Sequence, residues 1–69
     1  MNNENIIMAA KTYLNIHSSE YEFTDGTDID ILLNKLVEED FIDDNDYSET
    51  DKVVCHINGS NKECSVVIE

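Results

Sequence analysis

Apolar residues near the start of the chain recur at the spacing of one helix face. The stripe comprises Ile6, Ile7, Ala10, Tyr13, Leu14 and His17. This i, i+3, i+4, i+7 pattern is typical of an amphipathic helix that buries one side. We therefore predict a helix over residues 4–16, capped at its N-terminus by Asn2 or Asn3. Ser18 and Ser19 end the pattern.

Two further patterns follow in the middle of the chain. Residues 20–23 alternate polar and aromatic side chains, which predicts a short strand or an extended loop. Thr27, followed three positions later by Asp30, resembles the capping box that opens a helix. The apolar residues after it again have a helical spacing, and they are Ile29, Leu32, Leu33, Leu36, Val37 and Phe41. We predict a second helix over residues 28–40.

The last part of the chain alternates apolar and polar residues on both sides of a turn sequence, Asn58-Gly59-Ser60-Asn61. This arrangement predicts an antiparallel hairpin. With a four-residue loop, the facing pairs are Ile57 and Lys62, Cys55 and Cys64, and Val53 and Val66. A two-residue Asn-Gly turn changes the partners but keeps the same faces. The predicted fold is α+β, a single domain (1–69) of two helices, a C-terminal β-hairpin and a short third strand near residues 20–23.

The charge of the chain limits its choice of partner. The 69 residues include 16 Asp and Glu against 4 Lys and Arg, which gives a formal net charge of −12. Such a charge disfavours direct binding to nucleic acid or to a membrane surface, because both are polyanions. No apolar run approaches the roughly 18 residues of a membrane span, and the start lacks the basic and apolar regions of a signal peptide. We expect a cytoplasmic protein with a basic partner.

The densest run of acids lies between residues 38 and 51. It contains Glu38, Glu39, Asp40, Asp43, Asp44, Asp46, Glu49 and Asp51, with Tyr47 among them. The first three fall in the last turn of the predicted second helix, where the helix dipole favours cations. We predict that these residues form a partner-binding site whose spaced carboxylates resemble the phosphates of a nucleic-acid strand. The alternative is a solvated acidic loop.

Two patterns suggest metal ligands, and neither is complete. Asp44, Asp46 and Ser48 have the spacing of a calcium-binding loop, but Glu49 replaces the glycine that such a loop requires. Cys55 and His56 are adjacent in a predicted strand, so their side chains point to opposite faces and do not share a zinc site. We expect no metal and no cofactor, with a calcium-dependent binder as an alternative.

The positions of the two cysteines and of His56 indicate structural roles for these residues rather than catalytic ones. In a reducing cytosol Cys55 and Cys64 are expected to be free thiols in the core, although an oxidant can join them across the hairpin. His56 and Glu63 are predicted to face each other as an ion pair on the outer hairpin surface. A catalytic Cys–His pair requires hydrogen-bond contact, which opposite strand faces prevent. We expect no catalytic residues and no enzymatic activity.

In size, acidity and lack of catalytic motifs, the chain resembles phage-encoded nucleic-acid mimics, including many anti-CRISPR proteins. The resemblance implies a small inhibitor that binds a basic nuclease, a CRISPR effector or another nucleic-acid-binding protein and blocks nucleic-acid binding in the host cytoplasm. It rests on no alignable motif and transfers no residues. The alternative is an antitoxin, an immunity protein, a regulatory subunit or a homodimer that uses an apolar interface, with its charge serving solubility.

Overall fold

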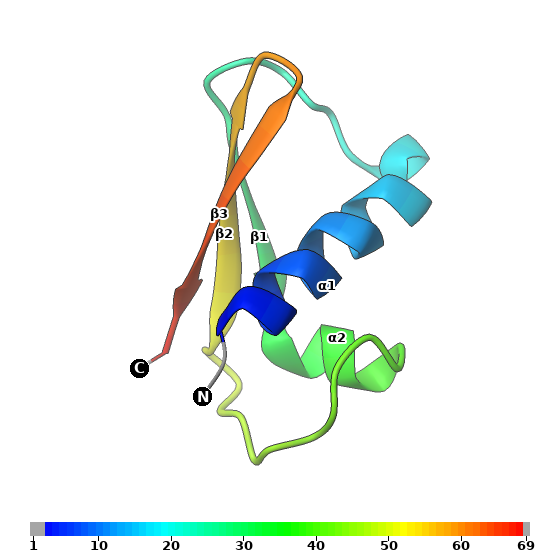
Figure 1. Cartoon of the computed structure of the whole chain (residues 1–69), viewed down its shortest axis with the longest axis vertical. Coiled ribbons are helices and arrows are strands. Elements are labelled where there is room, and N and C mark those ends of the chain that lie inside the picture. Colours follow the sequence, from blue (N-terminus) through cyan, green and yellow to red (C-terminus); the bar gives the residue numbers. More distant parts are fainter. Residues whose placement is uncertain (1–2, 69) are drawn as a thin grey trace.

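The computed structural model describes residues 3–68. The elements in chain order are α1 (Asn3–Ile16), the 3₁₀ turn η1 (Ser18–Glu20), β1 (Asp28–Leu32), α2 (Leu33–Glu38), β2 (Lys52–Asn58) and β3 (Asn61–Val67). The three strands form one antiparallel sheet in the order β1-β2-β3. Both helices lie on the same side of this sheet (Figure 1). The prediction of an α+β fold is confirmed.

The core lies between the sheet and the two helices. α1 packs across β2 and β3, and α2 packs against β1 and β2. The buried cluster consists of Ile6, Ala10, Tyr13, Leu14, Ile29, Ile31, Leu33, Leu36, Val53, Cys55 and Ile57. Tyr21, Phe23 and Phe41 pack at its edge. The helices therefore cover one face of the sheet and leave the other face to solvent.

The first helix is confirmed with nearly the predicted bounds. α1 begins at Asn3 and ends at Ile16, and it buries Ile6, Ala10 and Leu14 along one side. Asn2, the other candidate for the N-cap, lies outside the described residues. The apolar stripe was sufficient for this prediction, because a helix that covers a sheet must bury one continuous face.

β2 and β3 pair in the predicted register, with Val53 opposite Val66 and Cys55 opposite Cys64. Gly59 lies in the turn with a φ of 64°, a conformation that glycine adopts without steric cost. A disulfide joins Cys55 to Cys64, so the expectation of free thiols is wrong. The register explains the bond, because directly opposed residues of antiparallel strands lie within the reach of a disulfide.

The prediction is wrong for the segment between the first helix and α2. Residues 28–32 form β1 instead of the first turns of a helix, and residues 20–23 contain no strand. Ile29 and Ile31 are buried and their neighbours in β1 are exposed, which is the pattern of a strand with one covered face. β-Branched residues favour a strand where a neighbouring strand offers hydrogen bonds, and β2 supplies that neighbour. The helix that follows is therefore confined to Leu33–Glu38.

Candidate functional site

The acidic segment, residues 38–51, leaves α2 through a tight left-handed turn. The backbone N–H of Phe41 donates to the carbonyl of Leu36 at 2.8 Å, and that of Asp40 donates to the carbonyl of Val37 at 3.0 Å. This pair of bonds is the Schellman motif, which ends a helix with one residue in the left-handed conformation. That residue is Asp40, with a φ of 63°. The turn packs Phe41 against the core and leaves Asp40 exposed.

The rest of the acidic segment is the long loop between α2 and β2 in Figure 1. Two side-chain hydrogen bonds fix its path. Asn34 Nδ2 donates to the carbonyl of Tyr47 at 3.3 Å, which holds the loop against α2. The backbone N–H of Asp46 donates to Asp44 Oδ1 at 3.1 Å, which tightens the loop at its most acidic point. The loop therefore has a defined path from helix to strand.

A groove of about 880 Å³ lies between α1 and the acidic segment. Its apolar lining consists of Ile6, Met8 and Ala9 from α1 and of Phe41, Ile42 and Tyr47 from the acidic segment. The side chain of Met8 is largely open to solvent, with 66% of its surface exposed. The flexible thioether of methionine adapts to many shapes, so an exposed methionine in a groove is suited to contact with a partner.

Carboxylates line the same groove on the side of the acidic segment. They belong to Asp40, Asp43 and Asp44, and within the part of the chain that the structure describes no lysine or histidine lines the groove. Asp44 accepts the bond from Asp46 described above, whereas the carboxylates of Asp40 and Asp43 make no hydrogen bond or ion pair with any described residue. The groove therefore combines an apolar lining with carboxylates, and none of its described lining residues is a lysine or a histidine.

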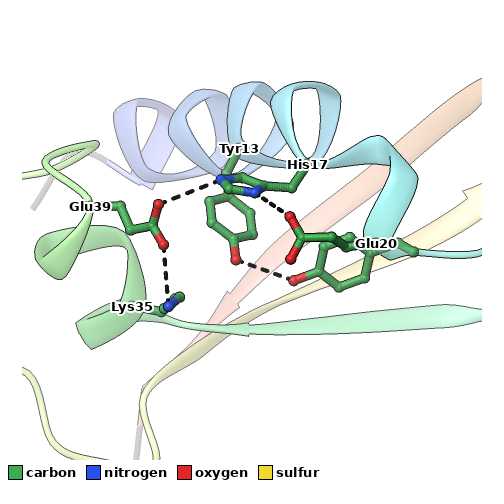
Figure 2. A network of polar contacts seen from close by, with 6 residues as sticks. Tyr13, His17, Glu20, Lys35 and Glu39 are labelled. Carbon is green, nitrogen blue, oxygen red and sulfur yellow. Dashed lines mark hydrogen bonds and ion pairs between the residues drawn. The ribbon is translucent and has the colours of Figure 1, made fainter.

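Glu39, by contrast, belongs to a polar network that joins the two helices (Figure 2). Its carboxylate lies 3.2 Å from Lys35 Nζ and 3.5 Å from His17 Nε2, and His17 Nδ1 pairs in turn with Glu20. The hydrogen bond from Lys35 and the negative charge of Glu39 raise the pKa of Lys35. Glu39 therefore has partners within the fold and is less available to another molecule than the acids of the groove.

A pair of tyrosines packs beneath this network. The ring of Tyr13 lies 4.4 Å from that of His17, measured between centroids. The hydroxyl of Tyr21 donates a hydrogen bond to the hydroxyl of Tyr13 at 3.3 Å. This hydrogen bond and the burial of the ring raise the pKa of Tyr13. A phenol that stays protonated at neutral pH supplies packing and orients His17, but it is a poor general base.

Asp51 has a structural role at the end of the acidic segment. It is only 4% exposed. Its carboxylate accepts hydrogen bonds from the backbone N–H of Ser48 at 2.9 Å and from the Ser48 hydroxyl at 3.2 Å. Its carbonyl accepts a further bond from the N–H of Leu33 at 2.9 Å. Asp51 therefore fixes the turn from which β2 begins, and its carboxylate lies beneath the surface.

The predicted site residues thus lie in different environments. Those that line the groove are Asp40, Asp43, Asp44 and Tyr47. Those that are exposed outside it are Glu38, Asp46 and Glu49. The acids after Glu38 lie on a cap, a turn and a loop, because α2 ends there. The even spacing along a helix face that motivated the comparison with phosphates is therefore not present.

The wall of the groove that α1 provides was not predicted from the sequence. Met8 lies off the predicted apolar stripe, and Ile42 follows the predicted second helix. Met8 itself was the available signal, since it is a large apolar residue on the otherwise polar side of an amphipathic helix. The two walls are far apart in the sequence, so only the fold brings them together.

A second group of acids lies on the uncovered face of the sheet. Asp28 Oδ1 lies 2.6 Å from His56 Nδ1, and Asp30 Oδ2 accepts a hydrogen bond from Lys52 Nζ at 3.1 Å. The bond to Asp28 raises the pKa of His56. His56 does lie opposite Glu63 in the register, as predicted, but its ion pair is with Asp28. On this face Asp28 and Asp30 each have a cationic group beside them.

Among residues 3–68, no three His, Cys, Asp or Glu side chains come together in an arrangement that could hold a metal ion. No helix in the described range has the length and apolar character that crossing a membrane requires.

The chain matches no protein-family model, no curated protein and no solved structure. The groove and its carboxylates are therefore the basis for a functional proposal.

Proposed function

We propose that this protein is a small acidic inhibitor that binds a basic nucleic-acid-handling protein, such as a nuclease or a CRISPR effector, and blocks nucleic-acid binding. The observation that carries the proposal is the groove, whose described lining contains three aspartates and neither a lysine nor a histidine. The net charge of −12 adds a long-range negative potential. A cationic surface gains more from such a potential than a neutral or anionic one does.

In this mechanism the carboxylates occupy the places that phosphates take in a cationic channel. Lysine and arginine side chains of the partner pair with the carboxylates instead of with nucleic acid. Electrostatic steering makes the encounter fast at low salt. The inhibitor itself binds no nucleic acid, needs no cofactor and catalyses no reaction. It acts in the cytoplasm, which is that of the host cell if a phage encodes it.

A pull-down with the tagged protein at low and at high salt tests the proposal, with the bound proteins identified by mass spectrometry. We expect a basic nucleic-acid-binding protein that salt releases and whose affinity for nucleic acid falls as the inhibitor is added. A partner that still binds nucleic acid when saturated with inhibitor would contradict the proposal. Parallel pull-downs with and without a thiol reductant are needed, because a reducing cytoplasm opposes the bond between Cys55 and Cys64.

Exposed apolar residues on α1 favour a second candidate function. Met8 is 66% exposed and Ile16 is 65% exposed. An antitoxin, an immunity protein, a regulatory subunit or a homodimer that buries these side chains would bind through apolar contact, with charge serving solubility. Salt distinguishes the two functions, because apolar association changes little with ionic strength whereas exposed charge pairs are screened. Size-exclusion chromatography over a range of concentrations detects the homodimer.

A further inference from the structure

We infer that the groove between α1 and the acidic segment is the docking site for a short, amphipathic, cationic segment of the partner, an inference that rests on the proposed function. Such a segment presents an apolar side chain to the lining formed by Met8, Ala9 and Phe41. Its flanking lysine or arginine side chains reach Asp40 and Asp43. The groove thus requires both an apolar anchor and cations from one ligand.

The apolar requirement follows from Met8 and the residues behind it. Met8 is 66% exposed, while Ile6 and Ala9 on the same helix are 4% and 9% exposed. The groove therefore has a closed apolar base and an open apolar edge. Covering that edge with a partner side chain removes apolar surface from water, which is favourable in proportion to the area covered. Amphipathic helices bind grooves of this kind through apolar residues spaced along one face.

The groove also requires cations, because a ligand that covers its apolar lining removes water from the carboxylates. A ligand seated in the groove takes Asp40 and Asp43 partly out of water, and neither has a partner of its own among the described residues. A neutral apolar ligand leaves both charges desolvated and unpaired, which is costly. A ligand with lysine or arginine at the flanks pairs them. The groove therefore rejects neutral and anionic segments, and nucleic acid with them.

The dimensions of the groove limit the length of the segment. On α1 its lining extends from Asn5 to Thr12. At a helical rise of about 1.5 Å per residue, this distance is roughly 10 Å. It accommodates about two turns of a partner helix, or about three residues of an extended chain. One apolar anchor with a cation on either side fills that length.

A second copy of this chain does not meet these requirements. The net charge of −12 makes two copies repel each other. Lys35 and Lys52 already pair with carboxylates of their own chain, and Lys62 lies 4.9 Å from the centre of the Phe23 ring. Docking one of these three lysines in the groove of another copy would break a contact within its own chain. Lys11, the remaining lysine, supplies only one cation, whereas the groove requires a cation on each side of an apolar anchor. The occupant that fits is a basic protein.

The test uses two synthetic peptides of identical composition, made of lysine and leucine. In one peptide leucine recurs at helical spacing to form an apolar face, and in the other the order is scrambled. Binding to the full chain is measured by calorimetry at low and at high salt, and NMR chemical shifts locate the contact. We expect the patterned peptide to bind at least about tenfold more tightly, the gain that covering one large apolar side chain provides. Its shifts should concentrate on Ile6, Ala9 and Phe41.

Two substitutions on α1 form a matched pair for this measurement. Met8→Gln removes the apolar edge of the groove, and Ile16→Gln removes a side chain of nearly equal exposure, 65%, that does not line the groove. We expect Met8→Gln to weaken the patterned peptide about tenfold and Ile16→Gln to leave it unchanged. Equal affinities for the two peptides, or equal effects of the two substitutions, would overturn the inference.

The same variants separate this inference from the proposed function. If Met8→Gln still displaces nucleic acid from the natural basic partner at full strength, the inhibitor function stands and the docking groove is wrong. If the patterned peptide binds in the groove but no basic partner loses its nucleic acid, the groove stands and the inhibitor function is wrong.

Discussion

The groove and the uncovered face of the sheet both carry aspartates. The aspartates of the sheet pair with cationic side chains, and those of the groove do not within the described part of the chain. On the sheet, Asp28 lies 2.6 Å from a nitrogen of His56, and Asp30 lies 3.1 Å from that of Lys52. At the groove, Asp40 and Asp43 have no such neighbour among the described residues. The proposed function depends on this difference between paired and unpaired carboxylates.

The backbone makes this contrast sharper. Asp28 and Asp30 occupy ordinary strand positions, where exposed polar residues alternate with buried ones. Asp40 occupies a left-handed position, with a φ of 63°, where glycine is the usual residue. Asp46, an exposed acid of the acidic segment outside the groove, has a similar conformation with a φ of 54°. Left-handed backbone therefore occurs along the acidic segment and not on the sheet.

Reversing charges in the acidic segment, compared with the same reversal elsewhere on the surface, gives the largest expected effect. Glu38→Lys with Asp43→Lys changes the acidic segment, and Glu22→Lys with Glu63→Lys makes the same change in net charge elsewhere on exposed positions. We expect the first pair to weaken binding to the basic partner by about tenfold or more at low salt, because steering depends on local potential. The second pair should have a much smaller effect, and affinity measured over a salt series compares them.

Both pairs change exposed side chains, so each should alter the free energy of unfolding by no more than about 0.5 kcal/mol. Urea denaturation of the two variants provides this control. Equal losses of affinity would show that binding depends on the net charge of the protein and not on where the acids lie.

Substitutions at Asp40 give a smaller effect and separate stability from binding. Asp40→Gly should raise the free energy of unfolding by about 0.5–1 kcal/mol, part of the roughly 1–2 kcal/mol that the left-handed conformation costs a residue with a side chain. Asp40→Asn should leave it nearly unchanged, since asparagine also tolerates this conformation. Both variants remove the carboxylate, so both should bind the basic partner more weakly.

Urea denaturation and partner affinity are measured on the same preparations of these two variants. A less stable Asp40→Gly protein would show that the carboxylate supports the fold. Asp40 would then stabilise the fold, as the paired acids of the sheet do. The difference between the groove and the sheet would not hold at Asp40.

The pH dependence of the sheet pair is the smallest expected effect. Asp28 raises the pKa of His56 above its ordinary value of 6.5, so protonated His56 is favoured in the folded state. The stability from this pair is fully present below about pH 6.5 and is lost as pH rises through the raised pKa. Asp28→Asn should therefore reduce stability more at pH 6 than at pH 9. Urea denaturation at both pH values, with an NMR titration of His56, measures this; a loss independent of pH would contradict it.

The hairpin was predictable from the sequence because its signals are local. Val53, Cys55 and Ile57 alternate up to an Asn-Gly turn, and pairing in the chosen register buries all of them on one face. A shift by one residue would have exposed that face, so the pattern itself specifies the register. The facing cysteines followed from the register, although their oxidation depends on the redox environment rather than on the pattern.

β1 and the groove were not predictable, because each depends on parts of the chain that are distant in sequence. Ile29, Leu32 and Leu33 fit the spacing of a helix, whereas Ile29 and Ile31 fit the alternation of a strand. Pairing with β2 is what favours the strand. The acids of residues 38–51 look equivalent in the sequence. The fold buries Asp51 and places Asp43 in the groove, a difference that arises from packing rather than from composition.

The bond between Cys55 and Cys64 also affects the denatured chain. The two cysteines are nine positions apart, and the covalent ring they close contains the whole turn between β2 and β3. When the oxidised protein unfolds, this ring persists, so the denatured ensemble keeps the two strands close together. The conformational search that remains on refolding is the docking of β1 and α1 onto strands already near each other. The reduced chain must first close that turn from an open coil, with the additional loss of entropy that closure requires.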